Sequence, residues 1–110
     1  HVPGYLAQAE ALRAAGVDEV WCVSVNDAFV MGAWGREQNT EGKVRMMADG
    51  SAEWTRRLGL DQDLTARGMG VRSKRYAMVI DDGVVTHLWL EAPGEFKVSS
   101  AEAVLAALRA

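Results

Sequence analysis

The strongest constraint on the fold is a hairpin signal in the second half of the chain. Two apolar, β-branched runs, residues 76–80 and 84–90, flank the pair Asp82-Gly83. A two-residue hairpin turn of the primed type needs positive φ at both central positions, and Asp-Gly pairs adopt that conformation readily. The spacing therefore predicts an antiparallel pair of strands over these residues.

The first half of the chain alternates helical and strand-like segments. Small and apolar residues recur at helical spacing over residues 5–15, and Gly16 then supplies a stop. Residues 20–25 form a short, nearly continuous apolar run that is typical of a buried strand. Asn26-Asp27 is expected to form a turn and cap, followed by a second helix from Ala28 to about Gln38 and a strand at 44–48. This β–α–β order predicts a parallel pair of strands.

Three more segments complete the expected order of elements. Ser51 is expected to cap a short helix, and the glycine-containing residues 59–71 are expected to form a loop. Ser99 and Glu102 have the spacing of a capping box, which predicts the start of a last helix. The order α, β, α, β, α, β, β, α favours an α/β fold with a mixed sheet flanked by helices, the thioredoxin-like arrangement. That arrangement also needs a central strand feeding the first helix, for which these residues supply no candidate.

Composition excludes several classes of function. The 110 residues suit a single domain, and 12 basic against 15 acidic residues give a net charge of −3. We therefore expect no general binding of nucleic acid or of anionic membranes. A lone cysteine and two distant histidines argue against a disulfide within the chain and against a metal site. The same cysteine usage favours a reducing compartment, and we expect a cytoplasmic location.

Four cations gather near a glycine-containing loop. They are Arg67, Arg72, Lys74 and Arg75. A run of this kind is usually a solvated loop. The alternative is a site for an anion or a thiolate, because Arg75 stands immediately before an apolar strand, where its guanidinium could reach a cleft over the sheet edge.

Cysteine and aromatic residues leave two further questions open. Cys22 lies in an expected buried strand, where a free cysteine is ordinarily a small core side chain. A redox-active thiol would need exposure and nearby positive charge. Phe29 and Trp34 stand near the start of a helix, and either pack beneath it or form an exposed association patch.

Several blocks of the chain, taken together, resemble the type II peroxiredoxins, the group of peroxiredoxin-5-like thiol peroxidases. The most specific block is Ser24-Val25-Asn26-Asp27-Ala28-Phe29. The others are His1-Val2-Pro3-Gly4-Tyr5, Trp34, Gly42-Lys43-Val44-Arg45, Ala48-Asp49, Gly70-Val71-Arg72-Ser73-Lys74-Arg75-Tyr76-Ala77-Met78 and Asp82-Gly83-Val84-Val85. The resemblance extends over the whole chain and suggests the C-terminal two thirds of a thioredoxin-like peroxiredoxin domain, with residues 1–110 forming an N-terminally incomplete domain.

The resemblance implies a reaction and a site. Peroxiredoxins reduce hydrogen peroxide and alkyl hydroperoxides with a peroxidatic cysteine, which the resemblance places four positions before His1. Arg75 matches the arginine of the family's active site, where it stabilises the thiolate and the transition state. The loop Gly68-Met69-Gly70 is expected to line the peroxide entrance.

Reductants and oligomeric state also follow from the resemblance. Cys22 matches a second cysteine of many type II members, and Ser99 stands where some animal members carry a third. We therefore expect no resolving thiol within the chain and reduction by an outside thiol: glutathione with glutaredoxin, or thioredoxin. No cofactor is expected. A homodimer is expected through the region of Phe29, and Trp34 either joins that surface or packs under its own helix.

A second hypothesis needs no catalysis. The 110 residues could form a non-catalytic thioredoxin-like fragment or an interaction module. The expected strands at 20–24 and 76–80 would then each keep an apolar edge without a partner strand, and such edges promote aggregation.

Overall fold

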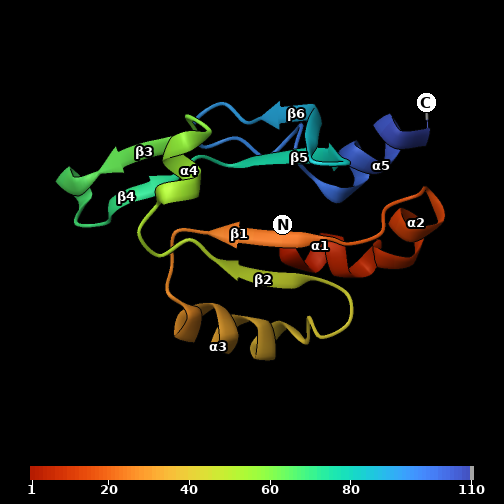
Figure 1. The fold of residues 1–110 in the computed structure, drawn as a ribbon, viewed down its shortest axis with the longest axis horizontal. Helices are drawn as coiled ribbons and strands as arrows, with labels where there is room; N and C mark the ends of the chain where they lie inside the picture. The colour runs from red at the N-terminus through yellow and green to blue at the C-terminus, as the bar shows by residue number, and fades with distance from the viewer. Residues whose placement is uncertain (110) are drawn as a thin grey trace.

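A computed structural model of the chain describes residues 1–109 (Figure 1). Its strands form three two-stranded sheets, and the helices lie around them. One pair is parallel and two are antiparallel, which confirms the expected mixture of strand directions with flanking helices. Within residues 1–109 the three pairs are separate ladders rather than one continuous sheet.

The chain opens with two short helices in succession. Helix α1 spans Val2–Ala7 and α2 spans Ala9–Ala14, with Pro3 in the first turn, where a missing N–H is harmless. Gly16 has a φ of 101° and donates its N–H to the carbonyl of Arg13, which ends the helical segment. The expected first helix is therefore confirmed, with an interruption at Gln8.

A parallel β–α–β unit follows. Strand β1 (Trp21–Ser24) pairs with β2 (Arg45–Ala48), and α3 (Ala28–Gln38) connects them. Asp27 caps α3 by accepting a hydrogen bond of 2.8 Å from the N–H of Val30, as its position in the sequence predicts. In Figure 1 this unit occupies the lower part of the molecule, with α3 beneath β2.

The cap of helix α4 (Glu53–Arg57) differs from expectation. Ser51 is not the cap. Ala52 occupies that position with a φ of 58°, and the Asp49 carboxylate accepts hydrogen bonds from the N–H groups of Trp54 and Thr55. Asp49 thus accepts the hydrogen bonds that were expected to go to Ser51, because the chain turns back over the start of α4.

The prediction that residues 59–71 form a loop is also wrong. Strand β3 (Asp61–Leu64) pairs in antiparallel fashion with β4 (Gly70–Ser73), and a 3₁₀ turn, η1 (Thr65–Arg67), joins them. The β3 residues are largely polar, so they lack the apolar alternation by which a strand is recognised.

The predicted hairpin is confirmed. Strand β5 (Tyr76–Asp81) pairs with β6 (Val84–Leu90), and the turn places Asp82 at φ 50° and Gly83 at φ 77°. Positive φ at both residues is the primed geometry that matches the twist of the strands.

The last helix, α5 (Ala101–Arg109), begins one residue later than the capping box predicts. The Ser100 hydroxyl accepts the N–H of Ala103, so Ser100 and not Ser99 is the cap. Helix α5 packs against α1 and buries Ala101, Val104 and Leu105. No helix within residues 1–109 is long and apolar enough to span a bilayer.

Candidate active site

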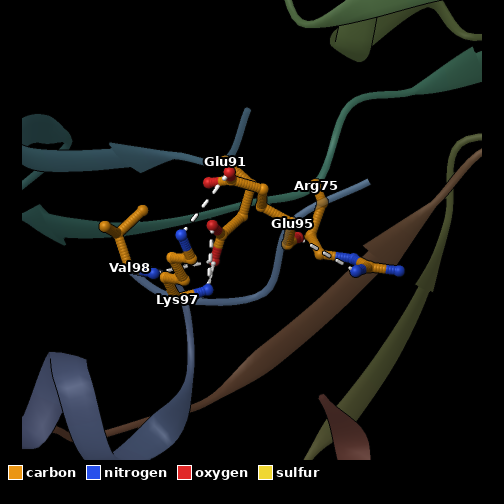
Figure 2. A network of polar contacts seen from close by, with 5 residues as sticks. All are labelled: Arg75, Glu91, Glu95, Lys97 and Val98. Atoms are coloured by element: carbon orange, nitrogen blue, oxygen red, sulfur yellow. Dashed lines mark hydrogen bonds and ion pairs between the residues drawn. The ribbon is translucent and has the colours of Figure 1, made fainter. Parts of the chain in front are cut away.

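Arg75 stands directly before β5 and reaches toward the loop after β6 (Figure 2). Its Nη1 donates a hydrogen bond of 3.1 Å to the carbonyl oxygen of Glu95. Its guanidinium carbon lies 5.8 Å from the centre of the Phe96 ring, a cation–π distance. The Arg75 side chain is exposed, so its charge is available to a ligand from the solvent side.

The loop that receives Arg75 is organised by a buried carboxylate, Glu91. Its Oε2 accepts the N–H groups of Lys97, Val98 and Ser99 at 2.8 to 2.9 Å and the Ser99 hydroxyl at 2.6 Å. Its Oε1 also accepts the N–H of Lys97, at 3.0 Å. Burial raises the pKa of Glu91, but these hydrogen bonds outweigh burial and lower the pKa to about 2. The carboxylate is therefore charged at any working pH.

His1 reaches the same loop from the start of α1. Its Nε2 lies 2.6 Å from the Ser99 hydroxyl oxygen, and its ring meets the Phe96 ring edge to face at 4.3 Å between centres. Because the Ser99 hydroxyl donates to a charged carboxylate, the bond to His1 requires Nε2 to carry the proton. Phe96 thus contacts both His1 and Arg75, and joins the start of α1 to the start of β5.

Tyr5 adds a second tie between α1 and this loop. Its hydroxyl donates to the carbonyl oxygen of Ser99 at 2.8 Å. Burial, with a contribution from the Glu102 carboxylate, raises the pKa of Tyr5 to about 12, so the phenol remains a donor. The loop is thus fixed to α1 through both the side chain and the backbone of Ser99.

The four clustered cations do not converge on one site. Arg72 donates from Nε to the carbonyl of Met69 at 2.8 Å and from Nη1 to Val25 and Asn26, which ties the β3–β4 hairpin to the turn before α3. Arg67 and Lys74 are exposed. Of the four, only Arg75 is directed at the Phe96 ring. Arg72 therefore has a structural role, and Arg75 is the candidate site residue.

The loop Gly68-Met69-Gly70 connects η1 to β4. Gly68 and Gly70 have φ of 73° and 64°, values that favour glycine, and the Met69 side chain is exposed. Arg72 donates a hydrogen bond to the Met69 carbonyl, and the N–H groups of Gly68 and Met69 donate to the carbonyls of Thr65 and Leu64. Its role as the wall of a peroxide entrance stays a prediction.

Cys22 lies in the middle of β1, opposite Met46 of β2. The side chain is half-buried, and burial raises the pKa of the thiol. A thiol with a raised pKa is largely protonated at neutral pH and is a poor nucleophile. Its surroundings therefore fit the core interpretation better than the redox one.

Phe29 and Trp34 sit differently on α3. Phe29 is 88% exposed, and its neighbour Val30 is also exposed, whereas Trp34 is half-buried. A large apolar side chain this exposed is a candidate for association, so of the two residues Phe29 fits the predicted interface better, and that interface stays a prediction.

Glu91, Ser99, Phe96 and His1 were not predicted as site residues. Their contacts join positions up to 98 residues apart, and sequence spacing does not reveal such contacts. Among residues 1–109, no group of three or more His, Cys, Asp or Glu side chains is placed to hold a metal ion.

The chain is similar to proteins named peroxiredoxins along nearly all of its length. Residues 1–105 match the Redoxin family. Peroxiredoxin-2B of Arabidopsis thaliana is 52% identical over 108 residues, which cover 98% of this chain and 67% of the relative.

Solved structures agree closely with the fold. Reduced Prx3 of Vibrio vulnificus in complex with hydrogen peroxide superposes with a TM-score of 0.95 at 57% identity, covering 99% of this chain and 66% of that one. A Burkholderia cenocepacia protein provisionally named a thioredoxin reductase superposes with a TM-score of 0.94 at 74% identity, covering 96% of this chain and 63% of that one. The chain thus spans about two thirds of the length of these relatives.

Proposed function

Because this chain belongs to the peroxiredoxins, within the Redoxin family, we propose that the protein containing it is a thiol-dependent peroxidase acting on hydrogen peroxide and alkyl hydroperoxides. The observation that carries the proposal is 52% identity to a peroxiredoxin along 98% of the chain. The hydrogen peroxide complex of the Vibrio relative supports the substrate class. The fixed, exposed guanidinium of Arg75 supports the chemistry.

The attacking thiolate is assigned to the cysteine that the resemblance places four positions before His1. If α1 extends by one turn, that cysteine lies on the same helix face as His1. His1 and Arg75 both contact Phe96, so the thiolate is expected to face the Arg75 guanidinium. A cation at this place lowers the pKa of the thiol and favours the nucleophilic form.

The reaction then proceeds by displacement at oxygen. The thiolate attacks one peroxide oxygen, an S–O bond forms, and the O–O bond breaks. The cysteine is oxidised to a sulfenic acid, and the departing alkoxide or hydroxide takes a proton to leave as alcohol or water. Arg75 donates hydrogen bonds to the oxygen on which negative charge builds, and its charge persists at any working pH.

An outside thiol completes the cycle. The thiol attacks the sulfenic acid and releases water with formation of a mixed disulfide, and a second thiol displaces the cysteine as a thiol. Ser99 carries a hydroxyl and no thiol, and the Cys22 thiol is half-buried in β1 with a raised pKa, so neither residue supplies a reactive resolving thiol. Glutathione with glutaredoxin, or thioredoxin, is therefore the proposed reductant, which fits a cytoplasmic location.

The test compares variants of the full-length protein. Arg75→Ala is expected to lower kcat/KM for hydrogen peroxide by about 10²- to 10³-fold, the usual loss when one oxyanion donor is removed. Arg56→Ala, which removes an exposed arginine from α4, is the matched control and should keep the wild-type rate. Unchanged turnover in Arg75→Ala would overturn the site assignment.

The same assay separates the alternatives. Peroxide-dependent thiol oxidation, run with glutathione and glutaredoxin or with thioredoxin, identifies the reductant. A non-catalytic module would give no turnover with either. The activity named for the Burkholderia relative would instead consume NADPH with oxidised thioredoxin and without peroxide.

We further propose a homodimer through the exposed start of α3. The support is the 88% exposure of Phe29 next to exposed Val30. Phe29→Asp should shift the protein from dimer to monomer in analytical ultracentrifugation. Val84→Asp, which changes another exposed apolar residue at the tip of the β5–β6 hairpin, should leave the dimer intact. A dimer that persists in Phe29→Asp would reject this surface.

A further inference from the structure

The Glu91 carboxylate is a buried charge that binds three consecutive backbone N–H groups and one hydroxyl, all from residues 97–99. Consecutive N–H groups converging on one anion form a concave site that holds a carboxylate firmly. Charge-assisted hydrogen bonds of this kind are about twice as strong as neutral ones. Glu91 therefore fixes the end of the loop that Figure 2 shows.

The other end of this loop is fixed by a turn. The N–H of Glu95 donates to the carbonyl of Ala92 at 2.9 Å, and Gly94 adopts a φ of 77°. Glu95 and Phe96 stand between this turn and the residues bound by Glu91. Their positions are therefore set from both sides.

These two residues hold Arg75. Glu95 offers its carbonyl oxygen to Nη1, and Phe96 offers its ring to the guanidinium. Glu91 also donates its own backbone N–H to the carbonyl of Arg75 at 3.0 Å. Glu91 thus fixes the Arg75 backbone directly and its side chain through the loop.

A second branch runs from Glu91 to His1. The Ser99 hydroxyl donates to the carboxylate and accepts from His1 Nε2, both at 2.6 Å. This order, with serine in the middle, differs from a nucleophilic triad, in which histidine stands between the other two. The Ser99 hydroxyl therefore orients His1 and is not itself activated.

We propose that Glu91 is a positioning residue of the peroxidase site, which holds Arg75 and His1 in contact with the Phe96 ring through the loop of residues 91–99. The assignment rests on the proposed function. Arg75 is exposed, and a long exposed side chain samples many rotamers unless its partners are fixed. Peroxide reduction needs the guanidinium at one place, and small displacements of a catalytic donor slow reactions strongly.

A double-mutant cycle in the full-length protein tests the assignment. Glu91→Gln is expected to lower the rate constant for peroxide reduction by about 10- to 100-fold. In the Arg75→Ala background the same change should have little further effect, because there is no guanidinium left to position. The pH midpoint for alkylation of the attacking cysteine by iodoacetamide should also move in Glu91→Gln toward the value of Arg75→Ala.

Two further variants distinguish a loss of Arg75 positioning from a general loss of folding. Asp49→Asn changes another carboxylate that accepts two N–H groups and a hydroxyl, but those belong to α4. It should leave the alkylation midpoint unchanged. Phe96→Leu changes a half-exposed ring, so the fold should persist while Arg75 and His1 lose their shared contact. It should reproduce the effect of Glu91→Gln.

The outcomes separate this assignment from the proposed function. An equal fold-loss from Glu91→Gln in the wild-type and Arg75→Ala backgrounds would show a general structural role and overturn the assignment alone. An alkylation midpoint that shifts equally in Asp49→Asn would do the same. A wild-type protein without peroxidase activity would overturn the proposed function, and the positioning role with it.

Discussion

Ser99→Ala is expected to lower the free energy of unfolding by more than Ser100→Ala does. The two serines are neighbours before α5, and the capping-box spacing predicts Ser99 as the cap. In the structure Ser100 accepts the N–H of Ala103, whereas Ser99 is fully buried with its hydroxyl between Glu91 and His1. The two hydroxyls therefore contribute to stability through different interactions.

The magnitudes follow from those contacts. Loss of a helix cap costs about 1 kcal/mol. Loss of a buried hydroxyl that hydrogen-bonds a charged group costs about 1.5 to 3 kcal/mol. Ser99→Ala leaves the His1 Nε2–H without its acceptor as well, so the larger end of the range is expected.

Replacing each serine by aspartate should produce a larger difference in stability between positions 99 and 100. Aspartate is among the best cap residues, so Ser100→Asp should be nearly neutral. Ser99→Asp would place a second carboxylate in a fully buried position against the Glu91 carboxylate. Like charges this close cannot both stay ionised without a large penalty, so this variant should be less stable than Ser99→Ala.

Urea unfolding of the full-length protein, followed by tryptophan fluorescence and extrapolated linearly to water, measures all four variants. The expected order of stability is Ser100→Asp, Ser100→Ala, Ser99→Ala, Ser99→Asp, from most to least stable. If Ser99→Asp is as stable as wild type and Ser100→Ala costs more than Ser99→Ala, then Ser99 is the cap and the buried network is wrong.

Further predictions concern pH, the lone thiol and helix packing. The pKa of Glu91 falls from its ordinary value of 4.5 to about 2 on folding, so its stabilising contribution is complete above pH 4.5 and is lost as the pH falls toward 2. Acid titration of unfolding should show a weaker pH dependence in Glu91→Gln than in wild type, and equal slopes would contradict the lowered pKa. Cys22→Ser should keep turnover with an external thiol because the half-buried thiol has a raised pKa, and a steady-state assay that shows no turnover would make it a resolving cysteine. Gly35→Ala should destabilise the protein by about 1 to 3 kcal/mol in thermal or urea unfolding, because the new Cβ meets Thr40 Oγ1 at 2.9 Å and Met46 Cγ at 3.0 Å, which outweighs the better helix propensity of alanine. A stabilised Gly35→Ala would show that these neighbours move aside.

Local chemistry made some elements predictable. Asp82-Gly83 forms the primed turn because both residues tolerate positive φ, and Asp27 caps α3 because its carboxylate reaches an N–H three residues on. Each of these interactions is contained within a few residues. A short stretch of sequence is therefore enough to predict the turn and the cap.

Two other elements were not predictable in this way. Strand β3 carries polar residues and exists because β4 pairs with it. Asp49 caps α4 from outside the usual position, since the intervening residues, with Ala52 at a φ of 58°, turn the chain back. Neither case shows a pattern that spacing rules recognise, because β3 lacks apolar alternation and Asp49 lies five and six residues before the N–H groups that it accepts.

The candidate site shows the same division. Arg75 could be singled out, because the resemblance matches it to a known arginine and because it precedes an apolar strand. The groups that hold it could not, since they are a backbone carbonyl, an exposed ring and a carboxylate that acts through backbone N–H groups. Backbone atoms carry no residue identity, so a site built on them has no sequence motif. The proposed role of Glu91 depends on this distinction: a residue that positions others through the backbone is visible only once the loop of residues 91–99 has been folded around it.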